Sequence, residues 1–221
     1  MARVFQQIVS LGPDCRTIHQ IRERFGRVSG RRGVFDWQGT PPAVVMDYMR
    51  SDFVGMFERD DLQVADGKVS NRRFGTSYKH LFPDGVTEAV LDARYPAVRK
   101  KHDRWCKTTR ALIRNGHSTL FVLGLPVTGR DMDELSILLE KAAPGRDFLL
   151  LAPPEGDRSD DWRGDYDVWR EHFAPFSIEP PLGRRIGLKF YRLGKRMFFR
   201  NSNPLNADEL IGMLNWLWKK R

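Results

Sequence analysis

The sequence is poor in cysteine and lacks long apolar runs. Its 221 residues contain two cysteines, Cys15 and Cys106, so a disulfide framework is not expected and a reducing cytoplasm is the natural setting. No apolar run approaches the roughly 20 residues that a membrane-spanning helix needs, so we expect no membrane span. The start of the chain has no apolar signal core, because Gln6 and Gln7 interrupt it, and we expect no secretion signal.

Several catalytic signatures are also missing. The chain has no glycine-rich nucleotide-binding motif, no serine in a nucleophile elbow and no histidine pair at metal-ligand spacing. A low-molecular-weight phosphatase loop needs an arginine six residues after its cysteine, and Ile21 occupies that place after Cys15. We therefore expect neither a cofactor nor a metal ion.

The patterns that are present indicate an α/β fold. A hydrophobic fraction of 41% is typical of a globular protein, and the length suits a single domain over residues 1–221. Strands and helices alternate, which favours a three-layer, mostly parallel sheet with helices on both faces. Strands are expected at 5–11, 118–125 and 148–152, helices at 15–25, 40–57, 93–115 and 131–143, hairpins at 62–70 and 187–199, a surface loop at 153–164 and a last helix from Asn206.

Basic residues give the chain a net charge of +9 and attract anions. They gather in two clusters, Arg94–Arg114 and Arg184–Arg200, the second interleaved with aromatic residues. Such a pattern can bind single-stranded nucleic acid, but it is more often the solvated face of a helix or hairpin. Nucleic acid is therefore compatible with the sequence without being favoured.

Cys15 is the strongest candidate for a catalytic residue. It follows an apolar strand and a Gly12-Pro13 turn, and Asp14 is a good N-cap for the helix that Cys15 begins. Backbone amides and the helix dipole at such a position stabilise a thiolate and could hold an oxyanion, so we expect a lowered thiol pKa. The alternative is a small buried hydrophobic residue that happens to begin a helix.

A nucleophilic cysteine needs a base. His19 lies four residues after Cys15, on the same face of the expected helix, although a partly exposed surface histidine is the commoner outcome. His80 ends an extended segment and lies between apolar residues. It could be the catalytic partner of Cys15 or, equally, a structural histidine in the core or at its edge. The remaining histidines carry weaker signals: His102 and His117 are expected at the surface, and His172 lies in a short amphipathic stretch.

Two acids could orient the base. Asp36 lies between Phe35 and Trp37, so it is expected to be partly buried and to need a partner, either His80 or a nearby arginine (Arg31 or Arg32). Asp84 lies four residues after His80 and could equally be a turn residue.

The combination of these pieces resembles a bacterial family of unknown function that is classed with the papain-like cysteine peptidases. The resemblance covers about residues 6–125 and rests on Ser10–Cys15, Val34–Trp37, Asp52-Phe53, Tyr78–His80 and the basic helix from Tyr95 that leads into Leu120–Val122. It implies a thiol nucleophile at Cys15, His80 as base and Asp36 or Asp84 as the third member.

Three functions remain open from the sequence. The first is a thiol-dependent hydrolase in which Cys15 attacks a carbonyl or acyl substrate, anionic or neutral, through a covalent acyl-cysteine, with His80 as base and Asp36 orienting it. The second is an acyltransferase that uses the same cysteine. The third is a non-catalytic protein that binds a polyanion through the basic clusters.

Overall fold

The computed structural model describes residues 2–26 and 32–181. The chain divides into two compact units, Met1–Ile178 and Glu179–Arg221, and the described helices and strands belong to the first. The hairpin at 187–199, the last helix and the second basic cluster lie outside the described residues. A single domain over residues 1–221 therefore stays a prediction.

A parallel sheet of three strands forms the centre of the first unit. Its order is β2-β5-β6, with β5 in the middle. Its strands are short and mostly apolar, as is typical of parallel strands covered on both faces: β2 (Gln7–Ser10), β5 (Thr119–Val122) and β6 (Phe148–Leu151). The mixed α/β class and the mostly parallel sheet are thus confirmed.

A second parallel pair continues this arrangement at the N-terminus. β1 (Arg3–Phe5) comes just before β2 and pairs with β7 (Phe176–Ile178). The sequence pattern did not reveal this pair, because each strand has three residues and Val4 is half exposed.

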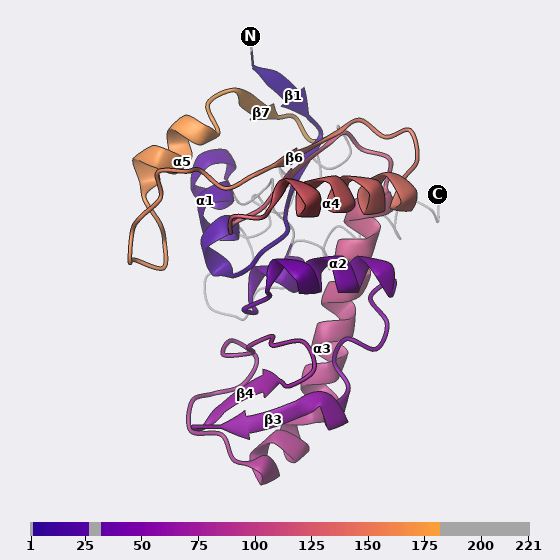
Figure 1. Cartoon of the computed structure of the whole chain (residues 1–221), viewed down its shortest axis with the longest axis vertical. Coiled ribbons are helices and arrows are strands. Elements are labelled where there is room, and N and C mark those ends of the chain that lie inside the picture. Colours follow the sequence, from indigo (N-terminus) through magenta and orange to yellow (C-terminus); the bar gives the residue numbers. More distant parts are fainter. Residues whose placement is uncertain (1, 27–31, 182–221) are drawn as a thin grey trace, which may run out of the picture. The chain divides into compact units, whose positions relative to one another are not determined.

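The two faces of the sheet bury different helices. Ile8, Leu120 and Leu149 lie opposite one another and face a cluster that includes Trp169 and Phe173. That cluster also receives α1 (Cys15–Phe25) and α5 (Tyr166–His172), which lie side by side in Figure 1.

The other face carries the larger core. Val9, Phe121 and Leu150, again opposite one another, point into it. Three helices contribute to this core, and α2 and α4 both cross α3 in the view of Figure 1: α2 (Pro42–Arg50), α3 (Glu88–Arg114) and α4 (Gly129–Ala142).

Three helix boundaries differ from the sequence prediction. α2 ends at Arg50 instead of 57, because Asp52 and Phe53 adopt positive φ angles of 50° and 66° that no helix contains. α3 begins five residues before 93, because Thr87 caps it. α4 is capped by Thr128, with Asp131 as the acidic partner of the capping box and not the cap itself.

The predicted hairpin is confirmed. β3 (Leu62–Ala65) and β4 (Lys68–Asn71) pair antiparallel and are joined by Asp66 and Gly67, both with positive φ as a tight two-residue turn requires. Two short 3-10 turns, η1 (Val34–Asp36) and η2 (Arg59–Asp61), complete the described elements. Within residues 2–26 and 32–181, no helix is long and apolar enough to cross a membrane.

Candidate functional site

Cys15 lies at the carboxyl edge of the sheet, where ligands of open α/β sheets usually bind. It is the first residue of α1, and the N-cap Asp14 accepts a hydrogen bond from the Arg16 amide at 2.9 Å. The thiol is free and partly buried. The strand, turn and helix around Cys15 are as the sequence predicts.

The electrostatics of the thiol differ from the prediction. Burial and the adjacent Asp14 carboxylate raise the pKa of Cys15. Its own backbone amide, Lys79 and Arg16 lower the pKa, but they offset the rise only in part. The expected lowering of the pKa is therefore wrong. The main physical reason is that burial disfavours the charged thiolate, and the N-cap Asp14 adds a negative charge beside the amides that would otherwise stabilise it.

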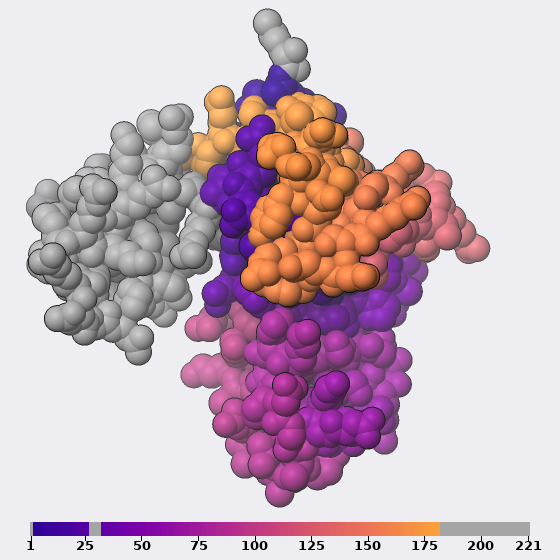
Figure 2. All heavy atoms as spheres, turned by 90° about the vertical axis from the view of Figure 1, so that its left-hand side faces the viewer, coloured from indigo at the N-terminus to yellow at the C-terminus, as the bar shows by residue number. Residues whose placement is uncertain are grey.

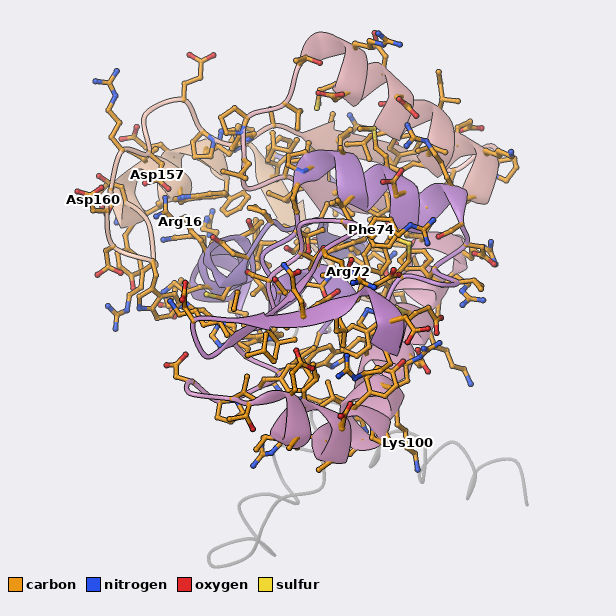
Figure 3. The ribbon with its side chains drawn as sticks, turned by 60° about the horizontal axis from the view of Figure 1, so that its bottom comes forward. Arg16, Arg72, Phe74, Lys100, Asp157 and Asp160 are labelled. Atoms are coloured by element: carbon orange, nitrogen blue, oxygen red, sulfur yellow. The ribbon has the colours of Figure 1, made fainter. Side chains whose placement is uncertain are left out.

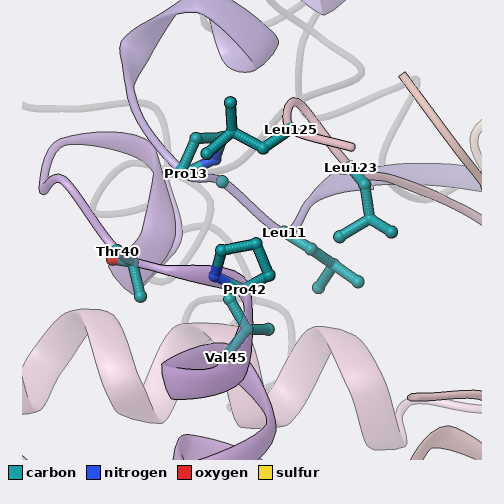
Figure 4. Close-up of a pocket in the computed structure, with 8 residues that line it drawn as sticks. Leu11, Pro13, Thr40, Pro42, Val45, Leu123 and Leu125 are labelled. Atoms are coloured by element: carbon teal, nitrogen blue, oxygen red, sulfur yellow. The ribbon is translucent and has the colours of Figure 1, made fainter. Parts of the chain in front are cut away.

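The turns that follow β2 and β5 pack against each other without spare room. Gly124 donates its amide to the Gly12 carbonyl at 2.7 Å, and the Thr17 hydroxyl donates to the same oxygen at 3.0 Å. A Cβ at Gly124 would overlap the Thr17 hydroxyl. Figure 4 shows the apolar recess beside these turns, which has essentially no room for a water molecule; it is lined by Leu11, Gly12, Pro13, Thr40, Pro42, Val45, Leu123 and Leu125.

Two further segments join the Cys15 turn. Thr40 donates its amide to the Pro13 carbonyl at 2.8 Å, and Gly39 exchanges two backbone hydrogen bonds of 2.9 Å with Ser77. Trp37 and His80 then meet edge to face, with ring centroids 5.2 Å apart. Hydrogen bonds and a ring contact thus connect the turn before Cys15 to the segment that ends at His80.

His80 is exposed, and its side chain is not bonded to the other predicted members of the site. Desolvation and Lys79 lower its pKa, and Asp14 partly opposes them, so the surroundings favour the neutral imidazole. Among the described residues, no hydrogen bond joins His80 to Cys15 or Asp36. The structure brings the segments together, and the Cys15–His80 pairing itself stays a prediction.

Asp36 lies deeper than the other candidates. It is 1% exposed and accepts a hydrogen bond from the Gly33 amide at 2.7 Å, and Phe35 beside it is fully buried. Burial raises its pKa to about 7, and the Gly33 amide, Arg22 and the Ser10 hydroxyl act against that rise. The expected burial of Asp36 and its need for a partner are confirmed, while its other neighbour, Trp37, is only partly buried. Asp84, the alternative acid, is exposed in a turn.

His19 is engaged elsewhere. Its Nε2 atom lies 2.9 Å from the Tyr166 hydroxyl, and its ring meets Trp162 edge-on at 5.0 Å. It is partly exposed, as the sequence predicts. No hydrogen bond joins it to Cys15 in the described part of the chain.

His102 corrects a second expectation. Predicted at the surface, it is 1% exposed, and its Nε2 atom lies 2.8 Å from the Tyr48 hydroxyl. Its Nδ1 atom is 3.6 Å from the Cys106 sulfur, and its ring stacks on Phe57. Burial lowers the pKa of His102 to about 4 and raises that of Cys106 to about 12, so both are neutral core residues. Their spacing of four residues on the apolar face of α3 was the available signal.

A cavity of about 320 Å³ opens at the carboxyl ends of β5 and β6. Arg16, the neighbour of Cys15, lines it together with Gly124, Asp157 and Trp169. Sequence reasoning missed this cavity because the predicted surface loop at 153–164 forms one wall of it.

Asp157 holds that loop against α1. It pairs with Arg16 at 3.2 Å and accepts a hydrogen bond from Trp169 Nε1 at 2.7 Å. Arg16 and Asp157 point toward each other in Figure 3, and Figure 2 shows the segment between β6 and β7 lying over α1. The cavity wall is therefore fixed by partly buried polar contacts.

Comparison with known proteins adds no relative: a scan of protein-family models, a search of curated proteins and a search of solved structures each found no match. Residues 2–26 and 32–181 contain no group of three or more His, Cys, Asp or Glu side chains that could hold a metal ion.

Proposed function

We propose that the protein is a thiol-dependent hydrolase of the papain-like cysteine peptidase kind, in which Cys15 forms a covalent acyl intermediate and His80 is the base. One observation carries this proposal. The Cys15 turn, the Trp37 turn and the segment ending at His80 are connected by backbone hydrogen bonds and the Trp37–His80 contact at the carboxyl edge of the sheet. The cavity lined by Arg16, the residue that follows Cys15 in the chain, offers space for a substrate at the same edge of the sheet.

The pKa directions favour a neutral thiol and a neutral imidazole in the resting enzyme. The pKa of Cys15 is raised and that of His80 is lowered, and both shifts disfavour a thiolate–imidazolium pair before the substrate binds. Cys15 Sγ attacks the carbonyl carbon while its proton passes to His80, and the amides at the start of α1 hold the oxyanion. Collapse expels the leaving group, which takes the proton from His80, and water then hydrolyses the thioester.

Asp36 acts in this scheme as a positioning residue. Its carboxylate holds the turn from Gly33 to Trp37, and Trp37 in turn contacts His80. The triad member expected from the sequence would thus orient the imidazole through the indole and not by a direct hydrogen bond. We place this site in a three-layer α/β domain, with the α1–α5 cluster and the α2–α4 core as outer layers, and in the cytoplasm, where Cys15 stays reduced.

A labelling experiment on the full chain tests the proposal. The protein is incubated with a 4-nitrophenyl acyl ester, and release of nitrophenol and the mass of the intact protein are followed. We expect an acyl adduct on Cys15 and turnover that Cys15→Ser abolishes and His80→Gln reduces by about 100-fold or more. Cys106→Ala is the matched control and should keep both. An equal adduct in Cys15→Ser would overturn the proposal. Transfer of the acyl group to an added amine in preference to water would identify an acyltransferase instead.

A further inference from the structure

The cations of α3 and its surroundings fall into two groups. Some are ion-paired: Arg99 with Glu58 and Asp103, and Arg110 and Arg114 with Asp52. Others form no ion pair among the described residues. They include Arg94, Lys100 and Lys107 of α3, as well as Arg32, Lys79, Lys101 and Arg104. The last four, together with His80, are called the cationic surface below.

Aromatic side chains and one hydrogen bond hold the cationic surface together. The Arg32 guanidinium lies over the Trp37 ring at 5.2 Å, and His80 meets the same ring from another side. The Lys101 ammonium lies over Trp105 at 4.9 Å. Val34 donates its amide to Thr109 Oγ1 at 2.9 Å and so fastens the Arg32 turn to α3.

The charges of the cationic surface act on one another. Desolvation, Arg32 and Arg104 lower the pKa of Lys101, and Lys101 contributes in turn to the lowered pKa of His80. This repulsion is a cost of the folded chain that a bound anion would remove. The surface also borders the candidate site, because Trp37, which both Arg32 and His80 contact, belongs to the turn that Thr40 fastens to the Pro13 carbonyl just before Cys15.

We propose that the cationic surface binds a phosphate group carried by a small acyl substrate and directs the acyl carbonyl toward Cys15. Guanidinium and ammonium groups without carboxylate partners are the usual ligands of phosphate. The substrate role rests on the proposed function, whereas anion binding itself does not require Cys15 to react.

The limits of the surface favour a small ligand over a polymer. Asp14 lies on the side of Cys15, and the Arg99–Asp103 and Arg110–Asp52 pairs flank Lys101 and Arg104 along α3. These carboxylates interrupt the positive charge around Lys101 and Arg104, whereas nucleic acid presents a long, uninterrupted row of phosphates.

Titration calorimetry with inorganic tripolyphosphate at low salt tests the binding. We expect Arg32→Gln and Lys101→Gln each to weaken binding by about tenfold, the usual effect of losing one charge-assisted contact. Lys100→Gln is the matched control, because it removes the same charge from an exposed residue next to Lys101 (labelled in Figure 3), and it should change binding less than about twofold. Equal weakening in all three variants, or no binding by the wild type, would overturn the proposal.

Two further measurements distinguish a failure of phosphate binding from a failure of the proposed hydrolase function. Cys15→Ser should bind tripolyphosphate as tightly as the wild type, whatever the chemistry of the thiol. Bound tripolyphosphate should slow alkylation of Cys15 by neutral iodoacetamide, and an unchanged rate at saturation would contradict the placement beside Cys15. Binding of single-stranded oligonucleotides that strengthens with length, without binding of tripolyphosphate, would replace the small ligand with nucleic acid.

Discussion

The carboxylate of Asp14 caps the helix that Cys15 begins, and it also raises the pKa of the Cys15 thiol. One side chain thus starts α1 and opposes formation of the thiolate at its first residue. The two effects can be separated, because asparagine caps helices about as well as aspartate but carries no charge.

Asp14→Asn should therefore lower the pKa of Cys15 and leave the fold intact. Each unit by which the pKa falls raises the thiolate fraction at pH 7 by about tenfold, so we expect alkylation by iodoacetamide to accelerate by roughly two- to tenfold. Cys106, whose pKa is about 12, serves as the internal control and should stay unreactive. An unchanged pH profile of alkylation would show that Asp14 does not act on the thiol.

His102 should make the protein less stable in acid. Burial lowers its pKa from 6.5 to about 4, so the unfolded chain binds a proton more readily than the folded one between these values. The contribution of a neutral His102 is complete above pH 6.5 and is lost as the pH falls toward 4, by roughly 3 kcal/mol at most. Urea unfolding from pH 4 to 7 should show a shallower pH dependence in His102→Gln; identical slopes would contradict the buried neutral histidine.

Asp36 should act in the opposite direction. Its pKa rises from 3.8 to about 7 on folding, so the folded state holds the proton more tightly across that range. The contribution of the protonated Asp36 carboxyl to the free energy of unfolding is complete below pH 3.8. This contribution is lost as the pH rises through 7. Asp36→Asn keeps an acceptor for the Gly33 amide and removes this loss, so the variant should gain stability over the wild type most clearly above pH 7. A variant that is less stable there would show that the charged carboxylate has a stronger partner than the Gly33 amide.

Local patterns in the sequence were sufficient for the central strands, the hairpin and the helix at Cys15. Each depends on neighbouring residues: Asp14 caps its own helix, and Asp66-Gly67 makes its own turn. The pairing of β1 with β7 was out of reach because its partners are far apart in the chain and too short to show a period.

The candidate site shows the same division. The sequence indicated Cys15 and the burial of Asp36 from adjacent residues, but it could not place the loop with Asp157 against Arg16. It also predicted His102 at the surface, because the many basic residues around His102 made this part of α3 look polar. The side of α3 that carries His102 in fact packs against Tyr48 and Phe57. Long-range packing decides these positions.

Gly124 tests the contact between the turns that follow β2 and β5. A Cβ there would overlap Thr17 Oγ1 and come within 2.7 Å of the Gly12 carbonyl oxygen, so Gly124→Ala must push the two turns apart. We expect a loss of about 1–3 kcal/mol in unfolding free energy, the usual cost of overpacking. Gly156→Ala is the matched control, because its Cβ would meet only Val168 at ordinary contact distances of 3.6 Å. Equal effects of the two substitutions would contradict the close approach.

Asp157 tests whether the wall of the cavity is held by its polar contacts. Burial would raise its pKa, but Trp169 Nε1, the amides of Asp165 and Ser159, and Arg16 together lower it, so the carboxylate is charged and fully bonded at pH 7. Asp157→Ala leaves the Arg16 charge and the Trp169 N–H without their partner, and we expect a loss of about 1–3 kcal/mol in unfolding free energy. Trypsin should then cleave after Arg158 or Arg163 faster than in the wild type. Asp160→Ala, an exposed neighbour in the same loop (Figure 3), should change neither measurement, and a similar change in both variants would mean that the loop is held by something other than Asp157.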